Sequence, residues 1–270
     1  MDGKKLSERQ KKVLALIEEQ GSVSTERLCE YLSISESTAR RVLMTLEGKK
    51  YIRRFRGGAM ILRSNRPEPP VLRRSQESHA EKEAIARRAL QYIHEGDTIL
   101  LSAGSTVLEL CPLLKDFQHL TVLTDSLLVQ NALMYEENIQ LILLGGILNA
   151  SEQCTYGFFT SDNAAHFRIN TFFTGAKAIS VRHGLMTDDF SHLPQYRSFR
   201  ECADRTVAMA HHQKLYQDGL ATLLRFQEVD ALLIDSGLPQ SLAGDLREAG
   251  CNLELCGPSY ASAPPPEQAK

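Results

Sequence analysis

Apolar and polar positions at the start of the chain repeat with the period of short amphipathic helices. The apolar residues within 13–17 fall on one side of a helix that Ser7 can cap and that stops at Gly21. Ser24 can cap a second helix over residues 25–32. The residues of this second helix that we expect to face inward are Leu28, Tyr31 and Leu32. The pattern therefore predicts two packed helices at the start of the chain.

A three-residue link leads to a third predicted helix over 36–49, which Ser35 can cap. Its apolar residues have the i, i+3, i+4, i+7 spacing of a helix face that packs on a core. They are Ala39, Val42, Leu43 and Leu46. The opposite face carries hydroxyl groups and arginines, which bind phosphates and base edges in DNA. Together with the capping serine, these candidate DNA-contacting residues are Ser35, Ser37, Thr38, Arg40, Arg41 and Thr45.

Two helices joined by a tight link, the second with an arginine-rich outer face, are typical of a helix-turn-helix. The next segment, 51–62, predicts two short strands around a glycine turn. Arginines beside that turn would meet phosphates or the minor groove next to the third helix. The residues concerned are Arg53, Arg54, Arg56, Gly57 and Gly58. Residues 1–62 thus predict a winged helix; the alternatives are a helical bundle and a glycine turn with solvated charges.

A proline-rich stretch over 63–78 predicts an extended linker and a domain boundary. A helix over 79–95 follows, and after it apolar runs of strand length alternate with helical segments. The predicted strands are 97–102, 120–124, 139–146, 170–176, 205–210, 230–235 and 252–255, and the predicted helices between them include 105–114, 126–137 and 239–249. This order predicts an α/β domain over 79–256, with a mostly parallel sheet flanked by helices. The proline-rich tail, 257–270, is expected to be disordered.

Small and polar residues gather where the predicted strands end. In open α/β sheets, ligands bind beyond the carboxyl ends of the strands, and glycine lets the backbone approach a phosphate closely. The candidate effector-binding residues are Ser102, Gly104, Ser105, Thr106, Asp125, Ser126, Gly145, Gly146, Lys177 and Lys214. A phosphorylated small molecule suits this set, and the sequence has no dinucleotide or P-loop motif. The alternative is that these segments are only tight turns.

The distribution of charge supports a nucleic-acid partner for the first part of the chain. Residues 1–66 contain 15 Lys and Arg against 8 Asp and Glu, a net charge of +7. The remainder contains 16 against 25, a net charge of −9, so the total of −2 hides the difference. Such asymmetry between segments indicates an anionic partner for the basic part.

Other features narrow the class of protein. No apolar run approaches the roughly 20 residues of a membrane span, and the first residues do not form a signal peptide. We therefore expect a cytoplasmic protein with no membrane partner and with its six cysteines reduced. Histidines lack the spacing of known ligand motifs, so we expect no metal and no cofactor. These histidines are His183, His192, His211 and His212.

The segments RQKKVLALIEEQGSVSTERLCEYLSISESTARRVLMTLE and IRRFRGGAMIL resemble the winged helix of DeoR-type transcriptional regulators. The family usually has Thr-Ile-Arg-Arg-Asp in the third helix, where this chain has Thr-Ala-Arg-Arg-Val at 38–42. The wing usually has His-Gly-Gly, where this chain has Arg-Gly-Gly at 56–58. The resemblance implies binding to a double-stranded DNA operator, with a different preference of target.

The second half resembles the sugar-phosphate sensor domain of the same regulators, which is related in fold to sugar-phosphate isomerases. The segments GSTVLELCPLL, LTDSLLVQNAL and LLGG look most like the glucitol-operon repressor branch. Several polar residues depart from the family pattern: Ser102 stands in place of Asp, Asp125 in place of Asn, and Tyr196 in place of Lys. The resemblance implies an effector pocket for a phosphorylated sugar or related metabolite, with altered recognition.

We expect a ligand-responsive regulator, specifically a repressor of a carbohydrate-utilisation operon. One winged helix makes few contacts with DNA, so two copies on neighbouring half-sites are expected, in a homodimer or homotetramer. One alternative is an architectural DNA binder without an effector. Another is an isomerase-like enzyme, in which Lys177 or Lys214 would move protons with an acidic residue. The candidates for that residue are Asp188, Asp189 and Glu201.

Overall fold

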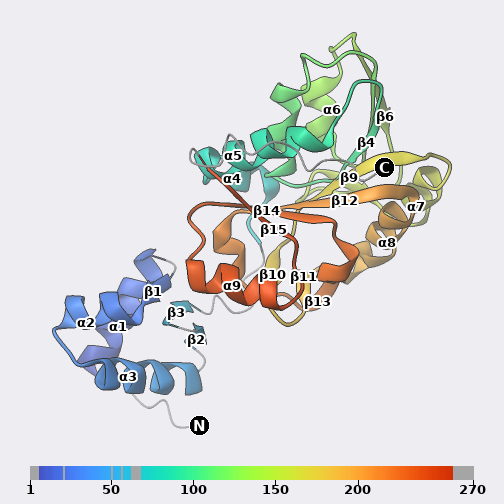
Figure 1. Cartoon of the computed structure of the whole chain (residues 1–270). Helices are drawn as coiled ribbons and strands as arrows, with labels where there is room; N and C mark the ends of the chain where they lie inside the picture. Colours follow the sequence, from blue (N-terminus) through green and yellow to red (C-terminus); the bar gives the residue numbers. More distant parts are fainter. Residues whose placement is uncertain (1–5, 21, 50, 56, 62–67, 258–270) are drawn as a thin grey trace.

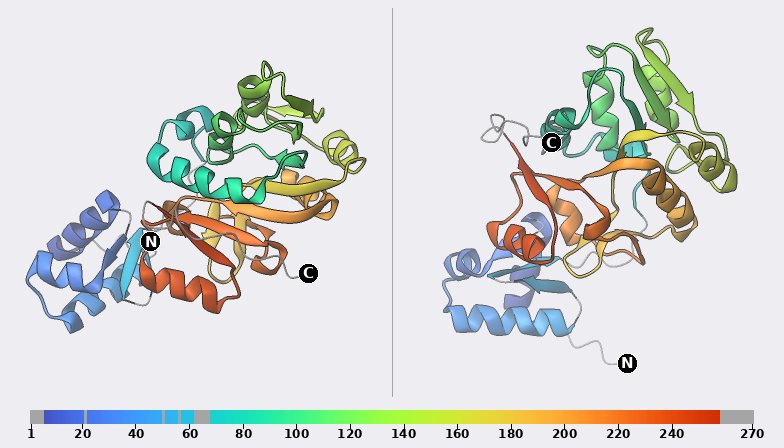
Figure 2. Two further views of the ribbon diagram at one scale, coloured as in Figure 1. Left: turned by 45° about the horizontal axis from the view of Figure 1, so that its top comes forward. Right: turned by 45° about the vertical axis from the view of Figure 1, so that its right-hand side comes forward.

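The computed structural model of the chain describes residues 6–20, 22–49, 51–55, 57–61 and 68–257 (Figure 1). Residues 63–67 of the expected linker and 258–270 of the expected tail lie outside these ranges. The N-terminal helices and strands form a separate body beside a larger α/β domain in all views (Figures 1 and 2). None of the helices in the described ranges has the length and apolar content that crossing a bilayer requires.

The N-terminal body is a winged helix, as the sequence predicts. Its elements are α1 (Glu8–Gln20), β1 (Ser22–Ser24), α2 (Thr25–Leu32), α3 (Glu36–Gly48), β2 (Ile52–Phe55) and β3 (Gly58–Ile61). The strands form an antiparallel sheet in the order β1-β3-β2. Side-chain oxygens accept hydrogen bonds from backbone N–H groups at the start of each helix. The pairs are Ser7 with Gln10, Ser24 with Arg27, and Ser35 with Thr38. All three predicted caps are therefore confirmed.

The core of this domain comes from the apolar faces that the periodicity predicts. Leu28, Leu43 and Leu46 are fully or almost fully buried together. The expectation for Tyr31 is wrong, because its side chain is 56% exposed. The short helix α2 buries only one narrow side, which carries Thr25 and Leu28.

The C-terminal domain is built on a seven-stranded parallel sheet, and all seven predicted strands are confirmed. They are β4 (Thr98–Leu101), β5 (Leu120–Thr124), β6 (Ile139–Leu143), β9 (Ile169–Thr174), β12 (Ala203–Met209), β14 (Ala231–Asp235) and β15 (Leu253–Cys256). The order in the sheet is β15-β14-β12-β9-β4-β5-β6, and every pairing is parallel. Strand order therefore reverses between β4 and β9, where the chain turns from building one half of the sheet to the other.

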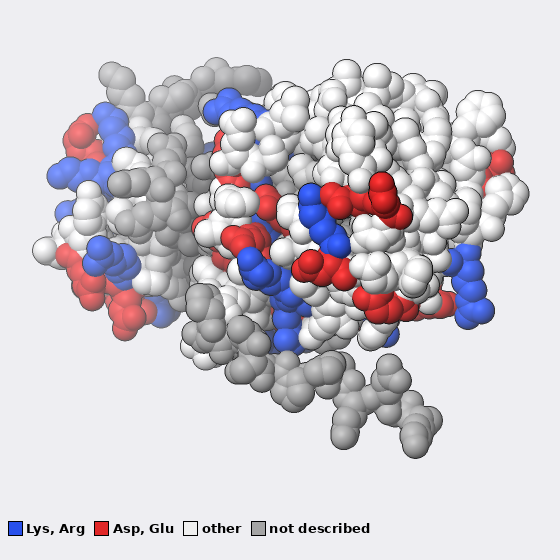
Figure 3. All heavy atoms as spheres, turned by 90° about the horizontal axis from the view of Figure 1, so that it is seen from above, with Lys and Arg blue, Asp and Glu red and all other residues white. Residues whose placement is uncertain are grey.

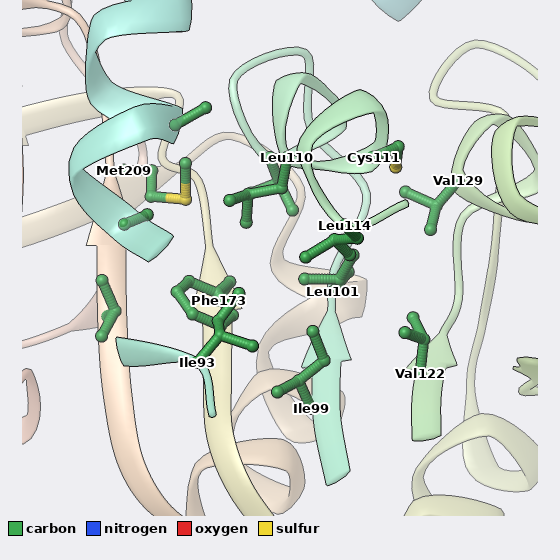
Figure 4. Packing of buried hydrophobic residues seen from close by; sticks show 14 of the residues in the cluster. Ile93, Ile99, Leu101, Leu110, Cys111, Leu114, Val122, Val129, Phe173 and Met209 are labelled. Carbon is green, nitrogen blue, oxygen red and sulfur yellow. The ribbon is translucent and has the colours of Figure 1, made fainter. Parts of the chain in front are cut away.

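Helices cover both faces of this sheet, which explains its continuous apolar strands. The flanking elements are α5 (His79–Ala89), η1 (Leu90–Tyr92), η2 (Val107–Leu113), α6 (Leu127–Leu133), α7 (Phe158–Ala164), α8 (Leu193–Cys202) and α9 (Gln240–Glu248). Successive residues of one strand face opposite cores. Leu101 and Phe173 pack in the cluster of Figure 4, whereas Leu100 and Phe172 pack under α8 on the other face.

Some predicted helices are shorter or differ in type. The helix expected over 79–95 ends at Ala89 and continues as the short 3-10 helix η1. The helix expected over 105–114 is the 3-10 helix η2, which contains Pro112. Proline lacks the N–H group that a continuous α-helix needs, so a regular α-helix is disfavoured there.

The expected linker is the main difference between pattern and structure. Its second half contains the short helix α4 (Val71–Ser75). Val71 is buried, and its N–H donates to the carbonyl of Ser151 at 3.1 Å. Residues 68–75 therefore pack on the α/β domain instead of forming an extended spacer.

Several smaller elements lacked a clear signal in the sequence. They are β7 (Ile147–Asn149), β8 (Cys154–Tyr156), β10 (Ala178–Ser180), β11 (Gly184–Thr187), β13 (Ala221–Leu224), η3 (Phe190–His192), η4 (His212–Tyr216) and η5 (Phe226–Glu228), in addition to α7 and α8. β10, β11 and β13 form an antiparallel sheet, and β7 pairs with β8. The runs that form the strands are only three or four residues long, which is too short for a periodic pattern.

Candidate functional site

The outer face of α3 is exposed in the way that contact with DNA requires. Ser37, Arg40, Arg41 and Thr45 are all exposed, while Thr38 is half-buried. Arg40 forms an i,i+4 ion pair with Glu36, with 2.5 Å between Nη2 and Oε1. Both of these side chains are more than 60% exposed, so the pair is weak and DNA phosphates can compete for the arginine.

The same face carries a residue that the sequence analysis did not select. Met44 is 60% exposed in the middle of α3, between Arg41 and Thr45. An exposed apolar side chain on a recognition helix can contact the methyl group of thymine. The spacing that identified the buried stripe also places Met44 outside it, so its exposure was predictable from the same pattern.

The wing is held against α3 by Glu47. The backbone N–H of Arg54 donates to Glu47 Oε1 at 2.8 Å, and Arg54 Nε lies 3.9 Å from Glu47 Oε2. Gly57 has φ 93°, a left-handed conformation that favours glycine, and its carbonyl accepts the N–H of Thr25 at 2.7 Å. Gly58 begins β3, Arg53 lies in β2, and Arg56 lies outside the described residues.

The second candidate site is a cavity of about 640 Å³ in the α/β domain. Its walls include the loop 103–106 after β4, the loop 175–177 after β9, and Lys214 in the segment after β12. These three strands are neighbours in the sheet. The cavity therefore lies at the carboxyl edge where strand order reverses, the usual ligand position in such sheets.

Five of the predicted effector residues line this cavity: Gly104, Ser105, Thr106, Lys177 and Lys214. Both lysines are largely buried, with side chains 10% and 7% exposed. Burial lowers the pKa of Lys177 because the ammonium loses its hydration.

The cations of the cavity are matched by carboxylates. Lys214 pairs with Glu68, and Lys177 pairs with Asp188. Arg74 contacts both Glu68 and Glu152. Burial raises the pKa of Glu152, although the guanidinium of Arg74 opposes this shift. Acidic and basic side chains are likewise interleaved on the molecular face in Figure 3.

Asp125 and Ser102 lie beneath the cavity wall, with both residues fully buried. The carboxylate of Asp125 accepts the N–H of Ala103 at 2.8 Å and the side-chain amide of Gln195 at 2.6 Å. Burial raises the pKa of Asp125 to about 7, and these two hydrogen bonds oppose the rise. Asp125 thus holds the loop after β4 from below, and Ser102 lies close to the buried phenol of Tyr196.

The remaining three predicted residues have local roles and are not among those that line the cavity. Ser126 caps α6 by accepting the N–H of Val129 at 3.3 Å. The carbonyl of Gly145 accepts the hydroxyl of Thr160 at 2.8 Å. A Cβ on Gly146 would lie 2.1 Å from Thr160 Oγ1, so this position requires glycine for packing.

Several polar residues of the cavity were missed at the level of the sequence. Arg74 and Glu68 fall in the expected linker. His192 stacks on Tyr156 with ring centroids 4.8 Å apart and lies 3.3 Å from Asp189. The other missed polar residues are Asn149, Ser151, Glu152 and Thr187. They come from distant segments and share no motif, so no local signal could have grouped them.

Comparison with known proteins agrees with this two-part architecture. Residues 9–65 match the DeoR-like helix-turn-helix domain, and residues 77–236 match the DeoR C terminal sensor domain. The chain belongs to the DeoR family. It is a DNA-binding transcriptional regulator with a C-terminal sensor domain.

Similar proteins match along nearly the whole chain. The glycerol-3-phosphate regulon repressor of Escherichia coli strain K12 is 30% identical, over 93% of this chain and 100% of that protein. The transcriptional repressor AccR of Agrobacterium fabrum is 30% identical, over 85% of this chain and 90% of that protein.

Among solved structures, ribose 5 phosphate isomerase A from Neisseria gonorrhoeae has a TM-score of 0.36 and 13% identity over 51% of this chain and 53% of that one. A structural likeness this distant carries no argument about function.

Substitution of the arginines on α3 tests the DNA-binding face of this DeoR-family protein. If Arg40 or Arg41 contacts a base, its replacement by Ala costs about 1–3 kcal/mol and relaxes specificity at one position. A phosphate contact instead weakens binding to target and scrambled DNA alike. Binding curves on a selected genomic fragment and its scrambled version distinguish the two cases. Arg87→Ala, an exposed arginine on α5 paired with Glu83, is the matched control. Full affinity in both α3 variants would contradict the assignment.

Replacement of Asp125 by Asn tests the buried carboxyl beneath the cavity. Its ordinary pKa of 3.8 applies in the unfolded chain, and its folded pKa is about 7. Between these values the folded state binds more protons, so wild-type stability falls as pH rises from about 4 to 7. The unfolding free energy of wild type relative to Asp125→Asn should fall by up to about 1.4 kcal/mol per pH unit. Urea unfolding across this range measures the slope, with exposed Asp116→Asn as the control. Parallel pH profiles of wild type and Asp125→Asn would refute the assignment.

Proposed function

We propose that this regulator is a repressor whose hold on operator DNA is released by a phosphorylated small molecule. The observation that carries the proposal is the convergence of Lys214, Lys177 and Arg74 on one cavity of about 640 Å³ at the point of strand reversal. Lysine and arginine form the strongest hydrogen bonds that a phosphate accepts. The relative named for the glycerol-3-phosphate regulon supports an effector of this class.

The other lining groups suit the remainder of such a ligand. The same cavity is lined by two hydroxyl residues, Ser105 and Thr106, and two carboxylate residues, Asp188 and Asp189. Carboxylates accept hydrogen bonds from the hydroxyl groups of a polyol or sugar, whereas they repel phosphate. A lining that contains both cations and carboxylates therefore favours a molecule that carries a phosphate and hydroxyl groups.

The DNA-binding unit of this proposal is a homodimer or homotetramer. Specific operators are bound with dissociation constants of roughly 10⁻⁸ to 10⁻¹¹ M, which a single small domain seldom reaches. Two winged helices on neighbouring half-sites supply the required contacts. The proposal includes no catalytic step, in keeping with relatives that are named as repressors.

Selection of genomic DNA followed by release tests the proposal. The full-length chain is mixed with genomic fragments, and the bound fragments are then challenged with phosphorylated and unphosphorylated sugars and polyols. Release by one phosphorylated compound, without its turnover, is expected. Turnover would favour an enzyme. Sequence-independent binding with no release would favour an architectural protein, and release by an unphosphorylated compound alone would contradict the phosphate assignment.

Replacement of Lys214 by Ala tests the place of the phosphate. A hydrogen bond to a charged group contributes about 1.5–3 kcal/mol, so the affinity for the released compound should fall by that amount. Calorimetry on the full-length chain measures it. Lys115→Ala is the control. Lys115 is an exposed lysine that pairs with Glu136 and is not among the residues that line the cavity, so this variant should bind as wild type does. Equal affinity in both variants would exclude Lys214 from the binding site.

A further inference from the structure

Glu68 lines the cavity and, like Arg74, belongs to the segment that joins the two domains. Its carboxylate accepts a hydrogen bond from Lys214 Nζ, and its Oε1 lies 3.3 Å from Arg74 Nη1. The side chains of Glu68, Lys214 and Arg74 are only 17%, 7% and 12% exposed. An acidic side chain from the connecting segment thus reaches into the sensor cavity.

The carboxylate of Glu68 occupies a position with the character of an anion-binding site. Two cations, Lys214 and Arg74, pair with this one carboxylate, and Lys177 lines the same cavity. Among the residues that the structure describes, Glu68 is the one carboxylate within ion-pair distance of Lys214. A phosphate is satisfied by the same donors as a carboxylate, and two anions cannot share them without strong repulsion.

We propose that Glu68 is an internal ligand of the sensor cavity and that the anionic effector competes with it for Lys214 and Arg74. This inference rests on the proposed function, since it needs an anionic effector in this cavity. Loss of Glu68 from the site without a replacement would leave Lys214 buried and unpaired, which is costly. Entry of the effector anion removes that cost, so binding of one anion drives release of the other.

The competition reaches the DNA-binding domain through the covalent chain. β3 of the wing ends at Ile61, and Glu68 follows seven residues later. Seven residues span at most about 25 Å when fully extended. While Glu68 is bound in the cavity, the end of β3 must remain within that distance of the backbone of Glu68. Displacement of Glu68 moves the last point of attachment to Val71, which is buried and bonded to Ser151, so the limit on the position of the wing rises to about 36 Å. A changed position of the wing alters its fit to two half-sites on DNA.

Replacement of Glu68 by Gln tests the competition with full-length protein. Gln keeps the size of the side chain and removes its charge, so the affinity for inorganic phosphate and for glycerol 3-phosphate should rise. The expected increase is roughly 5- to 150-fold, the usual range for coupled binding. Glu68→Ala should behave in the same way. Glu77→Gln, which removes an equal charge from an exposed partner of Arg73 in the same segment, should bind as wild type does.

A second experiment measures the DNA affinity of the same variants without any added anion. Glu68→Gln should bind the selected DNA fragment more weakly than wild type or Glu77→Gln, because it mimics the effector-bound state. Unchanged DNA affinity in Glu68→Gln would overturn the inference.

The two phosphate measurements separate this inference from the proposed function. Equal phosphate affinity in wild type and Glu68→Gln, with weaker binding in Lys214→Ala, would overturn the role of Glu68 and leave the proposed function intact. Failure of wild type and every variant to bind inorganic phosphate or any phosphorylated compound of the panel would overturn both.

Discussion

The reversal of strand order between β4 and β9 is the constraint on which the sensor domain depends. The connections that leave these adjacent strands run to opposite halves of the sheet, so the loops after them diverge and leave a crevice. The loops 103–106 and 175–177 form its walls. Small residues in these loops keep the crevice open, and Asp125 holds the first loop from below. The position of the cavity is therefore a consequence of topology, and the side chains decide what enters it.

Charge balance within the crevice gives the domain its capacity to respond. Arg74, Lys177 and Lys214 each form an ion pair with a carboxylate, so none of these three cations is buried without a partner. In the exchange that we propose, an anionic ligand takes the place of Glu68 beside Lys214 and Arg74. Because Glu68 belongs to the connecting segment, this exchange also changes how far the wing can lie from the sensor domain. A neutral ligand could fill the same volume without disturbing the arrangement.

The parts of this protein that were predictable depend on neighbours in the sequence. Caps such as Ser24 and Ser35 act within one helical turn, and the seven strands appear as continuous apolar runs. Contacts between distant segments were not predictable. Glu68 lies 146 residues from Lys214, and the prolines and few apolar residues around it suggested an extended linker. The roles of small and polar residues near strand ends were also ambiguous. Gly146 and Thr106 both stand near the end of a predicted strand, but Gly146 is required for packing and Thr106 lines the cavity.

In the proposed regulator, the sensor cavity and the DNA-binding face are thermodynamically coupled. Linkage requires that, if the effector weakens DNA binding by some factor, DNA weakens effector binding by the same factor. The direct measurement is calorimetric titration of the releasing compound into the full-length chain, alone and saturated with its selected DNA fragment. Coupling predicts that the effector binds the DNA complex more weakly than the free protein, by the same factor by which saturating effector weakens DNA binding. An effector affinity that is the same with and without DNA would contradict it.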